Sequence, residues 1–518
     1  MEQTRDYTTN QLQSNNATQI PQEIQVDEDH MNVSDAITLA GFGKFNLFLV
    51  FVGGGCLMCI IIESMGAMFV IPAADCDFKL TVSLKGFILA ASFLGIALTS
   101  HFWGFLADMY GRRIIILISM SLTFVVSVVS AFSINGWTFL VLKFLSGLFL
   151  SGTCSVLFTY VGELHSDFYR PIVMSWVVMF VAFGNTIMPG LAWLILPLEF
   201  SIKIPVINVL FKSWRLLALL YTVLTLLFTI LIFYREEEAR LVLTKIYTCN
   251  RGRLCNQLIV KKLILNEDFM RSIKSARFLS LMWSQTVQLY QMPYLIKTLL
   301  VDALQFGIFM ASTGFYMWYP EIMNNISKFE IQNPDKKGTI CRALKYHFDN
   351  NGVSTNDTLN SCSNTIRSDV FTVNLILGAF LVSLYFSIGC LVGYLGKRKC
   401  LLLLFLISIL SSIPAQYLSG STSIKVSMAL ALASYTSIGL INAVTVDLYP
   451  TQVRGMGVAM SLMFGRFGAV MGVHISGRLF YYMCTFSYII YAVFHIVLIT
   501  IVHFLTTKLE VSKHKNIV

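Results

Sequence analysis

Twelve long apolar runs dominate this chain, and they leave it few ways to fold. A helix needs about 20 apolar residues to cross the hydrocarbon of a bilayer, where only helices and closed barrels can satisfy their backbone hydrogen bonds. The sequence therefore predicts an all-α membrane protein with twelve transmembrane helices. The runs lie at residues 46–71, 84–106, 114–133, 138–161, 172–196, 214–234, 300–319, 370–394, 400–418, 424–447, 455–478 and 482–505.

The composition agrees with a membrane protein. Of 518 residues, 56% are hydrophobic and only 13% are charged, which does not fit a soluble globular chain. The formal net charge of +10 would suggest nucleic-acid binding in a soluble protein. Most basic residues here lie between apolar runs, however, where they orient the helices. We therefore expect the lipid bilayer, and no nucleic acid, as the surroundings of this chain.

The distribution of basic residues predicts the orientation. Six runs precede and six follow a polar loop at residues 235–298 that contains eleven Lys or Arg residues. An even number of spans places both termini on the same face as this loop, and the positive-inside rule makes that face cytosolic. The short loops after the second and eighth runs are also basic. The protein is thus expected to be a multi-pass protein of the plasma membrane or of an intracellular vesicle membrane.

The domain organisation follows from these runs and loops. The first residues are polar, with almost no aromatic side chains, so they cannot bury enough surface to offset the entropy of ordering. We expect a mostly disordered cytosolic tail (1–45), a six-helix bundle (46–234), a cytosolic central loop (235–298), a second six-helix bundle (299–505) with an exofacial loop (320–369), and a cytosolic tail (506–518).

The exofacial loop carries modification signals. It contains two glycosylation sequons, at Asn325 and at Asn356, of which the first is close to the membrane. Cys341 and Cys362 share the loop, so a disulfide between them is expected in this oxidising location. The cysteines show no zinc-binding spacing, and we expect neither a metal nor a cofactor.

A short turn motif occurs twice at the membrane surface. Two glycines permit a tight turn and the following basic residues hold it in the cytosol. Each copy is followed by an acid and an arginine seven residues apart, and such a duplication is typical of transporters. The residues are Gly104, Asp108, Gly111, Arg112, Arg113, Glu163 and Arg170 in the first copy, and Gly389, Gly396, Lys397, Arg398, Asp447 and Arg454 in the second.

These charges allow two interpretations. They can act only as a topogenic turn, with the basic residues retained in the cytosol. Alternatively they form a cytosolic gate, because opposite charges at helix ends lock two bundles when they meet and release them when they part. The second interpretation is the stronger prediction.

Twelve spans, a central cytosolic loop and the duplicated turn resemble the major facilitator superfamily. Finer motifs are similar to the branch that contains synaptic vesicle glycoprotein 2 and the organic-ion transporters. They are Gly41-Phe42-Gly43-Lys44-Phe45, Ser213-Trp214-Arg215, Trp318-Tyr319-Pro320-Glu321 and Gly465-Arg466-Phe467-Gly468. The resemblance implies two six-helix halves that rock about a central solute site. It also implies pseudo-symmetry between the halves.

Two departures from the family pattern bear on function. The second turn has Gly393 where an acid would match Asp108, and the Pro-Glu-Ser-Pro segment usual after the sixth span is missing. Both favour a transport-silent relative that acts in vesicle trafficking or as a receptor. This alternative stands beside the transporter prediction.

Three charged residues within apolar runs are the leading functional candidates. Glu63 lies in the first span, and an intramembrane acid is costly unless it is paired, protonated or directed to a cavity. Lys143 stands in the fourth span where the superfamily often has Arg, a position that the resemblance associates with proton coupling. Arg466 is the cation of the eleventh span. Burial should disfavour the charged form of Glu63 unless Lys143 or Arg466 comes close enough to offset the cost.

Aromatic and amide residues complete the candidate site. Such groups at the bilayer midplane suit organic ions or polyols, although each can equally be a packing residue. They are Trp176, Gln305, Tyr316, Asn374, Tyr435 and Asn442. Signatures of nucleotide-binding, serine-hydrolase and zinc-protease sites are missing, so we expect no enzyme. The prediction is a monomeric carrier of a small organic solute, driven by a proton or other ion gradient.

Overall fold

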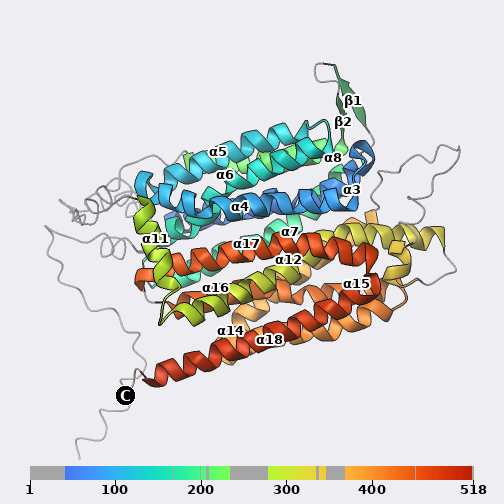
Figure 1. Ribbon diagram of the computed structural model, residues 1–518. Coiled ribbons are helices and arrows are strands. Elements are labelled where there is room, and N and C mark those ends of the chain that lie inside the picture. Colours follow the sequence, from blue (N-terminus) through green and yellow to red (C-terminus); the bar gives the residue numbers. More distant parts are fainter. Residues whose placement is uncertain are drawn as a thin grey trace, which may run out of the picture.

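The computed structural model describes residues 41–166, 168–198, 200–205, 209–233, 278–333, 338–345, 368–449 and 451–515. Its helices run lengthwise beside one another, with the first half of the chain on one side and the second half on the other (Figure 1). The first half contains α2 (Lys44–Met65), α3 (Ala67–Phe78), α4 (Val82–Tyr110), α5 (Arg112–Ala131), α6 (Gly136–Glu163), α7 (Arg170–Ile195) and α8 (Ser213–Phe233).

The second half begins after α11 (Phe278–Leu289), a short helix at one end of the bundle (Figure 1). It contains α12 (Leu295–Gln332), α14 (Ser368–Tyr417), α15 (Ser421–Ala431), the 3-10 turn η1 (Leu432–Thr436), α16 (Ser437–Leu448), α17 (Thr451–Tyr482) and α18 (Cys484–Lys515). The two halves meet where α4 packs against α17 and where α7 packs against α14.

Eleven helices among the described residues are long and apolar enough to cross a membrane. One of them, α14, has 50 residues and would be about 75 Å long as a straight helix, more than twice the thickness of the hydrocarbon. Gly396 interrupts it with φ of 79° and ψ of 157°. This break separates the predicted runs 370–394 and 400–418, and it accounts for the difference from twelve.

The ends of α12 and α18 lie far beyond the predicted runs. The structure continues α12 to Gln332, where the sequence predicted a loop from residue 320. The prediction is wrong here because the polar residues that end the apolar run are themselves buried in helical packing, among them Asn324, Asn325 and Ser327. The last helix, α18, likewise reaches Lys515, within the predicted C-terminal tail.

Close helix packing in the second half depends on glycine. A Cβ on Gly472 of α17 would lie 2.1 Å from the Met310 carbonyl oxygen of α12, and one on Gly468 would lie 2.1 Å from that of Phe306. Small residues let membrane helices approach backbone to backbone in this way. The contact fixes the rotation of α17, and thereby the direction in which Arg466 points.

A β-hairpin, β1 (Ser201–Ile204) with β2 (Val209–Lys212), projects from one end of the bundle (Figure 1). We call this the hairpin end. Asp77 at the tip of α3 anchors it: the Lys212 Nζ lies 2.5 Å from one carboxylate oxygen, and the Trp214 indole donates to the other at 2.8 Å. The first half therefore holds the hairpin by polar contacts of its own.

The expected modifications of the loop near this end need correction. Cys341 forms a disulfide with Cys484 at the start of α18, so the predicted bridge to Cys362 is wrong. Cys484 lies at the same end of the bundle as Cys341, although the two cysteines are 143 residues apart, and their spacing in sequence did not reveal this proximity. Asn325 is 8% exposed within α12 and its amide donates to Tyr481 Oη at 3.3 Å, so glycosylation there is excluded by burial. Asn356 lies outside the described residues.

Candidate functional site

A buried acid and a buried lysine meet in the core of the first half. The Glu63 side chain, 1% exposed, lies in α2, and its Oε2 is 3.6 Å from Lys143 Nζ in α6. Ser127 of α5 donates to the same oxygen at 2.7 Å, and Thr225 of α8 donates to the other oxygen at 3.2 Å. Four helices of one half thus converge on a single carboxylate.

This arrangement satisfies the conditions for an acid inside a membrane. An intramembrane charge requires a partner, and Lys143 neutralises Glu63 while the two hydroxyls occupy its oxygens. The set can also exchange a proton, because protonated Glu63 would still accept from Ser127 and Thr225. Of the two cations considered for Glu63, the structure places Lys143 beside it.

Arg466 lies between the two halves. Its guanidinium carbon is 5.5 Å from the ring centre of Phe309 in α12 and 5.9 Å from that of Phe93 in α4. Among the described residues the guanidinium has no acidic partner and no hydrogen-bond acceptor. Arg466 is partly exposed, and cation–π contacts do not neutralise its charge, so this site has a positive charge without an acidic partner among the described residues.

A tyrosine stack borders Arg466. The rings of Tyr316 and Tyr435 are 5.1 Å apart and nearly parallel, at 25°. Tyr435 is close enough to Arg466 to interact with its charge, and its hydroxyl points to Met65 of the first half, 3.6 Å from the sulfur. Both tyrosines are buried, so the stack closes the centre of the molecule between the halves.

Buried amides near the same interface are incompletely hydrogen-bonded. Gln305 donates to Asn442 Oδ1 at 2.9 Å, but its own carbonyl oxygen accepts no hydrogen bond from another described residue. In α7, the fully buried amide of Asn185 approaches the Tyr435 side chain, but neither of its polar atoms is placed for a regular hydrogen bond to another described residue. Unsatisfied buried amides are costly unless a ligand or water completes them. Asn185 was not singled out from sequence, because an isolated Asn in an apolar run gives no signal of its neighbours.

Two predicted cavity residues lie elsewhere. Trp176 is 40% exposed and packs against Phe42, with ring centres 6.1 Å apart. It is nine residues, or about 13 Å of helix, from Asn185. Asn374 is buried but donates to the Val370 carbonyl of its own helix at 2.8 Å. Neither Trp176 nor Asn374 is thus placed among the residues around Arg466.

The residues of the two turns contact their own halves. Arg112 pairs with Glu163, Arg113 donates to the Ile232 and Phe233 carbonyls of α8, and Arg170 donates to the Gly162 carbonyl at 2.9 Å. In the second half, Lys397 donates to the Ala443 carbonyl at 3.1 Å and Arg398 contacts His503 at 3.0 Å. The side chains of Asp108, Asp447 and Arg454 lie outside the described residues, so the pairing of the gate stays a prediction.

The glycines of these turns divide into two kinds. Gly111 and Gly396 have φ of 93° and 79°, a conformation that favours glycine and ends a helix abruptly. Gly104 and Gly389 lie within helices, and a Cβ there would meet nothing within 4 Å. The tight turn therefore depends on the second glycine of each motif.

Charged residues at the hairpin end were missed from sequence. Lys85 of α4 lies 2.7 Å from Asp75 of α3 and 2.7 Å from Glu321 of α12, so it links the halves. Asp75 and Lys85 stand at the ends of apolar runs, where charges are usually solvated. No local pattern distinguished them, and only Glu321 fell within a motif.

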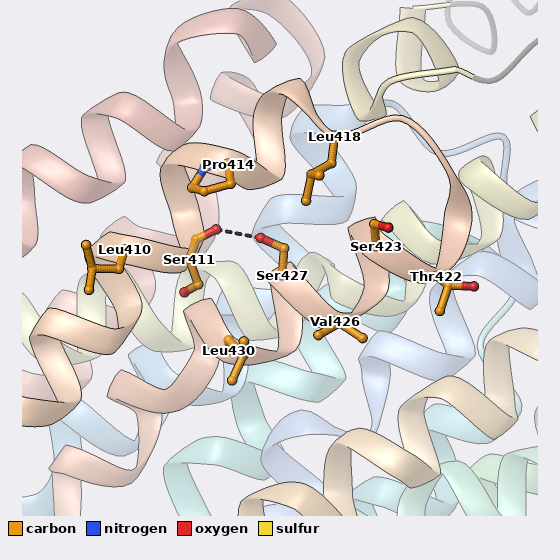
Figure 2. Close-up of a pocket in the computed structure, with 9 residues that line it drawn as sticks. All are labelled: Leu410, Ser411, Pro414, Leu418, Thr422, Ser423, Val426, Ser427 and Leu430. Atoms are coloured by element: carbon orange, nitrogen blue, oxygen red, sulfur yellow. Dashed lines mark hydrogen bonds between the residues drawn. The ribbon is translucent and has the colours of Figure 1, made fainter.

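A groove of about 470 Å³ lies on one side of the second half (Figure 2). The helices α14 and α15 line it, and Ser427 Oγ donates to the Ser411 carbonyl at 2.6 Å across it. Its outer residues include Leu410, which is 64% exposed, as expected for a surface that faces lipid. Because one half alone forms this groove, it is not the central site.

The family model described as Major Facilitator Superfamily matches residues 54–332, which is more than half of the chain. The chain belongs to the major facilitator superfamily. Similar solved structures include a D-xylose-proton symporter (15% identity, TM-score 0.57, 89% of this chain and 97% of that chain). Another is the xylose transporter of E. coli in a partially occluded inward-open conformation (14% identity, TM-score 0.60, 88% and 97%). These likenesses confirm the fold of this superfamily member.

The curated proteins similar to this chain include synaptic vesicle glycoproteins. Synaptic vesicle glycoprotein 2A of Homo sapiens is 28% identical over 327 residues, which cover 57% of this chain and 44% of the relative. Synaptic vesicle glycoprotein 2C of Mus musculus is 31% identical over 181 residues, covering 35% and 25%. The matches thus span less than half the length of these relatives.

Proposed function

We propose that this superfamily member carries a small organic anion across a membrane by alternating access. The observation that carries the proposal is Arg466, a cation between the two halves that has no acidic partner among the described residues. A carboxylate or similar anion bound there would be neutralised by the guanidinium. Its body would contact the Tyr435 ring of the tyrosine stack, and the buried amide of Asn185 beside Tyr435 would hydrogen-bond its polar groups.

The pair of Glu63 and Lys143 is proposed as the proton-coupling site. It lies apart from Arg466, in the core of one half, and its carboxylate already has both hydroxyl partners and a cation. A proton on Glu63 would release Lys143, and the change in charge would bias the packing of four helices. Fold neighbours include a protein named as a proton symporter, which supports protons as the coupling ion.

The orientation is proposed with the hairpin end outside the cytosol and both termini inside. The disulfide between Cys341 and Cys484 lies at the hairpin end, and disulfides form in oxidising compartments. Cys390, near the break of α14 at Gly396, is an exposed free cysteine. The protein is proposed to act as a monomer in a plasma or vesicle membrane.

A second function, vesicle trafficking or receptor activity without transport, is favoured by a specific feature. Gly393 replaces the acid expected in the second turn, and the similar curated proteins carry the name synaptic vesicle glycoprotein. Uptake by purified protein separates the two functions directly. A protein that binds organic anions but never moves them would be the transport-silent form.

Arg466→Gln should abolish uptake of organic anions into liposomes that contain the purified protein. The substitution removes the only charge proposed to neutralise the solute, and loss of a charge-assisted contact lowers affinity by about tenfold or more. A panel of labelled monocarboxylates and dicarboxylates, with matched quaternary amines, measures this. Arg478→Gln, on the same helix α17, is the control and should leave uptake intact. Uptake of amines instead of anions by the unaltered protein would contradict the proposed substrate class.

In the double variant Glu63→Gln with Lys143→Met, transport of the solute should no longer depend on the proton gradient. Both titratable charges disappear together, so neither is left unpaired, and exchange of labelled for unlabelled solute should persist without a response to pH. Counterflow at several pH values measures this. Ser127→Ala keeps both charges and should retain pH dependence. A pH response that survives in the double variant would assign coupling to another group.

A further inference from the structure

Lys85 makes two equivalent ion pairs at the hairpin end of the interface. Its Nζ lies 2.7 Å from Asp75 Oδ2 and 2.7 Å from Glu321 Oε1. The Lys85 and Glu321 side chains are 7% and 12% exposed, whereas that of Asp75 is 35% exposed. Of the ion pairs formed between described residues, the pair with Glu321 joins the two halves, and the others lie within the first half.

The two acids belong to different halves. Asp75 lies in α3 and Lys85 lies in the first turn of α4, so this pair would move together when the halves part. Glu321 lies in α12 of the second half. Separation of the halves at this end therefore breaks one ion pair of Lys85 and leaves the other intact.

Glu321 also keeps partners in its own half. Tyr481 of α17 donates to its Oε1 at 3.1 Å, and Asn325 donates in turn to the Tyr481 hydroxyl at 3.3 Å. Lys328, two turns further along α12, is close enough to interact with the Glu321 charge. After separation, Glu321 would thus retain a hydrogen bond and a nearby cation.

Removal of one partner from a buried ion pair is normally expensive, because it leaves a charge without compensation. Here both charges have a second partner within their own half, so the cost of opening is reduced. We propose that Lys85 is a latch that closes the hairpin end through Glu321 and stays neutralised by Asp75 when that end opens. Asp75 and Glu321 then compete for one lysine, and their competition sets the balance between the closed and open states.

The latch goes beyond the proposed function, because it requires that the halves separate but not that a solute is carried. It predicts opposite effects for two isosteric substitutions. Glu321→Gln weakens the link between the halves and should favour opening. Asp75→Asn removes the partner that Lys85 keeps in the open state. Lys85 then depends on Glu321 alone, so the population of the closed state should rise. A purely structural role of the cluster would make both variants looser.

A cysteine reporter in the full-length protein tests this without a solute. Leu375 of α14 lies across the interface from Gly190 of α7: its Cδ2 would be 3.7 Å from a Cβ placed on that glycine. The reporter variant is Leu375→Cys. The rate of its reaction with a maleimide in nanodiscs measures opening. We expect Glu321→Gln to raise the rate by about tenfold and Asp75→Asn to lower it, since a tenfold shift corresponds to about 1.4 kcal/mol.

Lys212→Met is the matched control, because Lys212 and Asp77 form an ion pair at the same end but entirely within the first half. It should leave the labelling rate unchanged, whereas Lys85→Met should raise it. Equal effects of Lys85→Met and Lys212→Met would overturn the proposal. So would rate changes in the same direction for Glu321→Gln and Asp75→Asn, or no change in either.

Discussion

Lys143→Met should destabilise the protein by about 3–5 kcal/mol, the cost of leaving a buried carboxylate without its cation. Glu63 is 1% exposed and its other partners are two hydroxyls, which cannot compensate a full charge. The midpoint of thermal unfolding of the purified protein in detergent should fall accordingly.

The matched comparison is the double variant Lys143→Met with Glu63→Gln. It leaves no charge in the cluster and keeps the size of both side chains, and replacement of a whole buried ion pair is often neutral. We therefore expect most of the lost stability to return. Lys203→Met, at an exposed position in β1, should change stability by less than about 0.5 kcal/mol. A double variant as unstable as Lys143→Met would show that the loss arises from packing and not from charge.

Gly472→Val should cost about 3 kcal/mol, because a Cβ there would lie 2.1 Å from the Met310 carbonyl oxygen and 2.7 Å from its Cα. Backbone atoms cannot rotate away as a side chain can, so α12 and α17 must separate. Thermal unfolding measures the loss, and Arg466 should lose its proper position as well.

Gly393→Val is the control, since a Cβ there meets nothing within 4 Å and its backbone conformation suits other residues. It should leave the unfolding midpoint almost unchanged. An equal loss at both positions would mean that helix propensity, and not close packing, decides the effect.

Hydrophobic runs predicted the spanning helices well because each run is a local property of the chain. They predicted the ends of helices poorly. In α12 the apolar run stops near Tyr319, but the helix continues because Asn325 and its polar neighbours are buried against other helices. A helix needs only its own backbone hydrogen bonds, so a change to polar residues does not end it.

Whether a side-chain contact could be predicted depended on how strongly the sequence constrained the partners. An acid inside a span needs a partner, a proton or a cavity, so the sequence left the surroundings of Glu63 open and named Lys143 and Arg466 as the cations that could offset its charge. Lys85 and Asp75 gave no such signal, because charges at the ends of apolar runs are usually solvated. The bond from Cys341 to Cys484 depends on which helix returns beside the loop, which spacing does not encode.

The two buried ion pairs lie in different places. The pair of Glu63 and Lys143 is wholly inside the first half, whereas the pair of Lys85 and Glu321 joins the two halves. A single substitution can therefore abolish one without touching the other. A variant that no longer carries a solute could therefore still open and close at the hairpin end, because Lys85 and Glu321 would remain. The transporter and the transport-silent protein could then differ by substitutions at only one of these two sites.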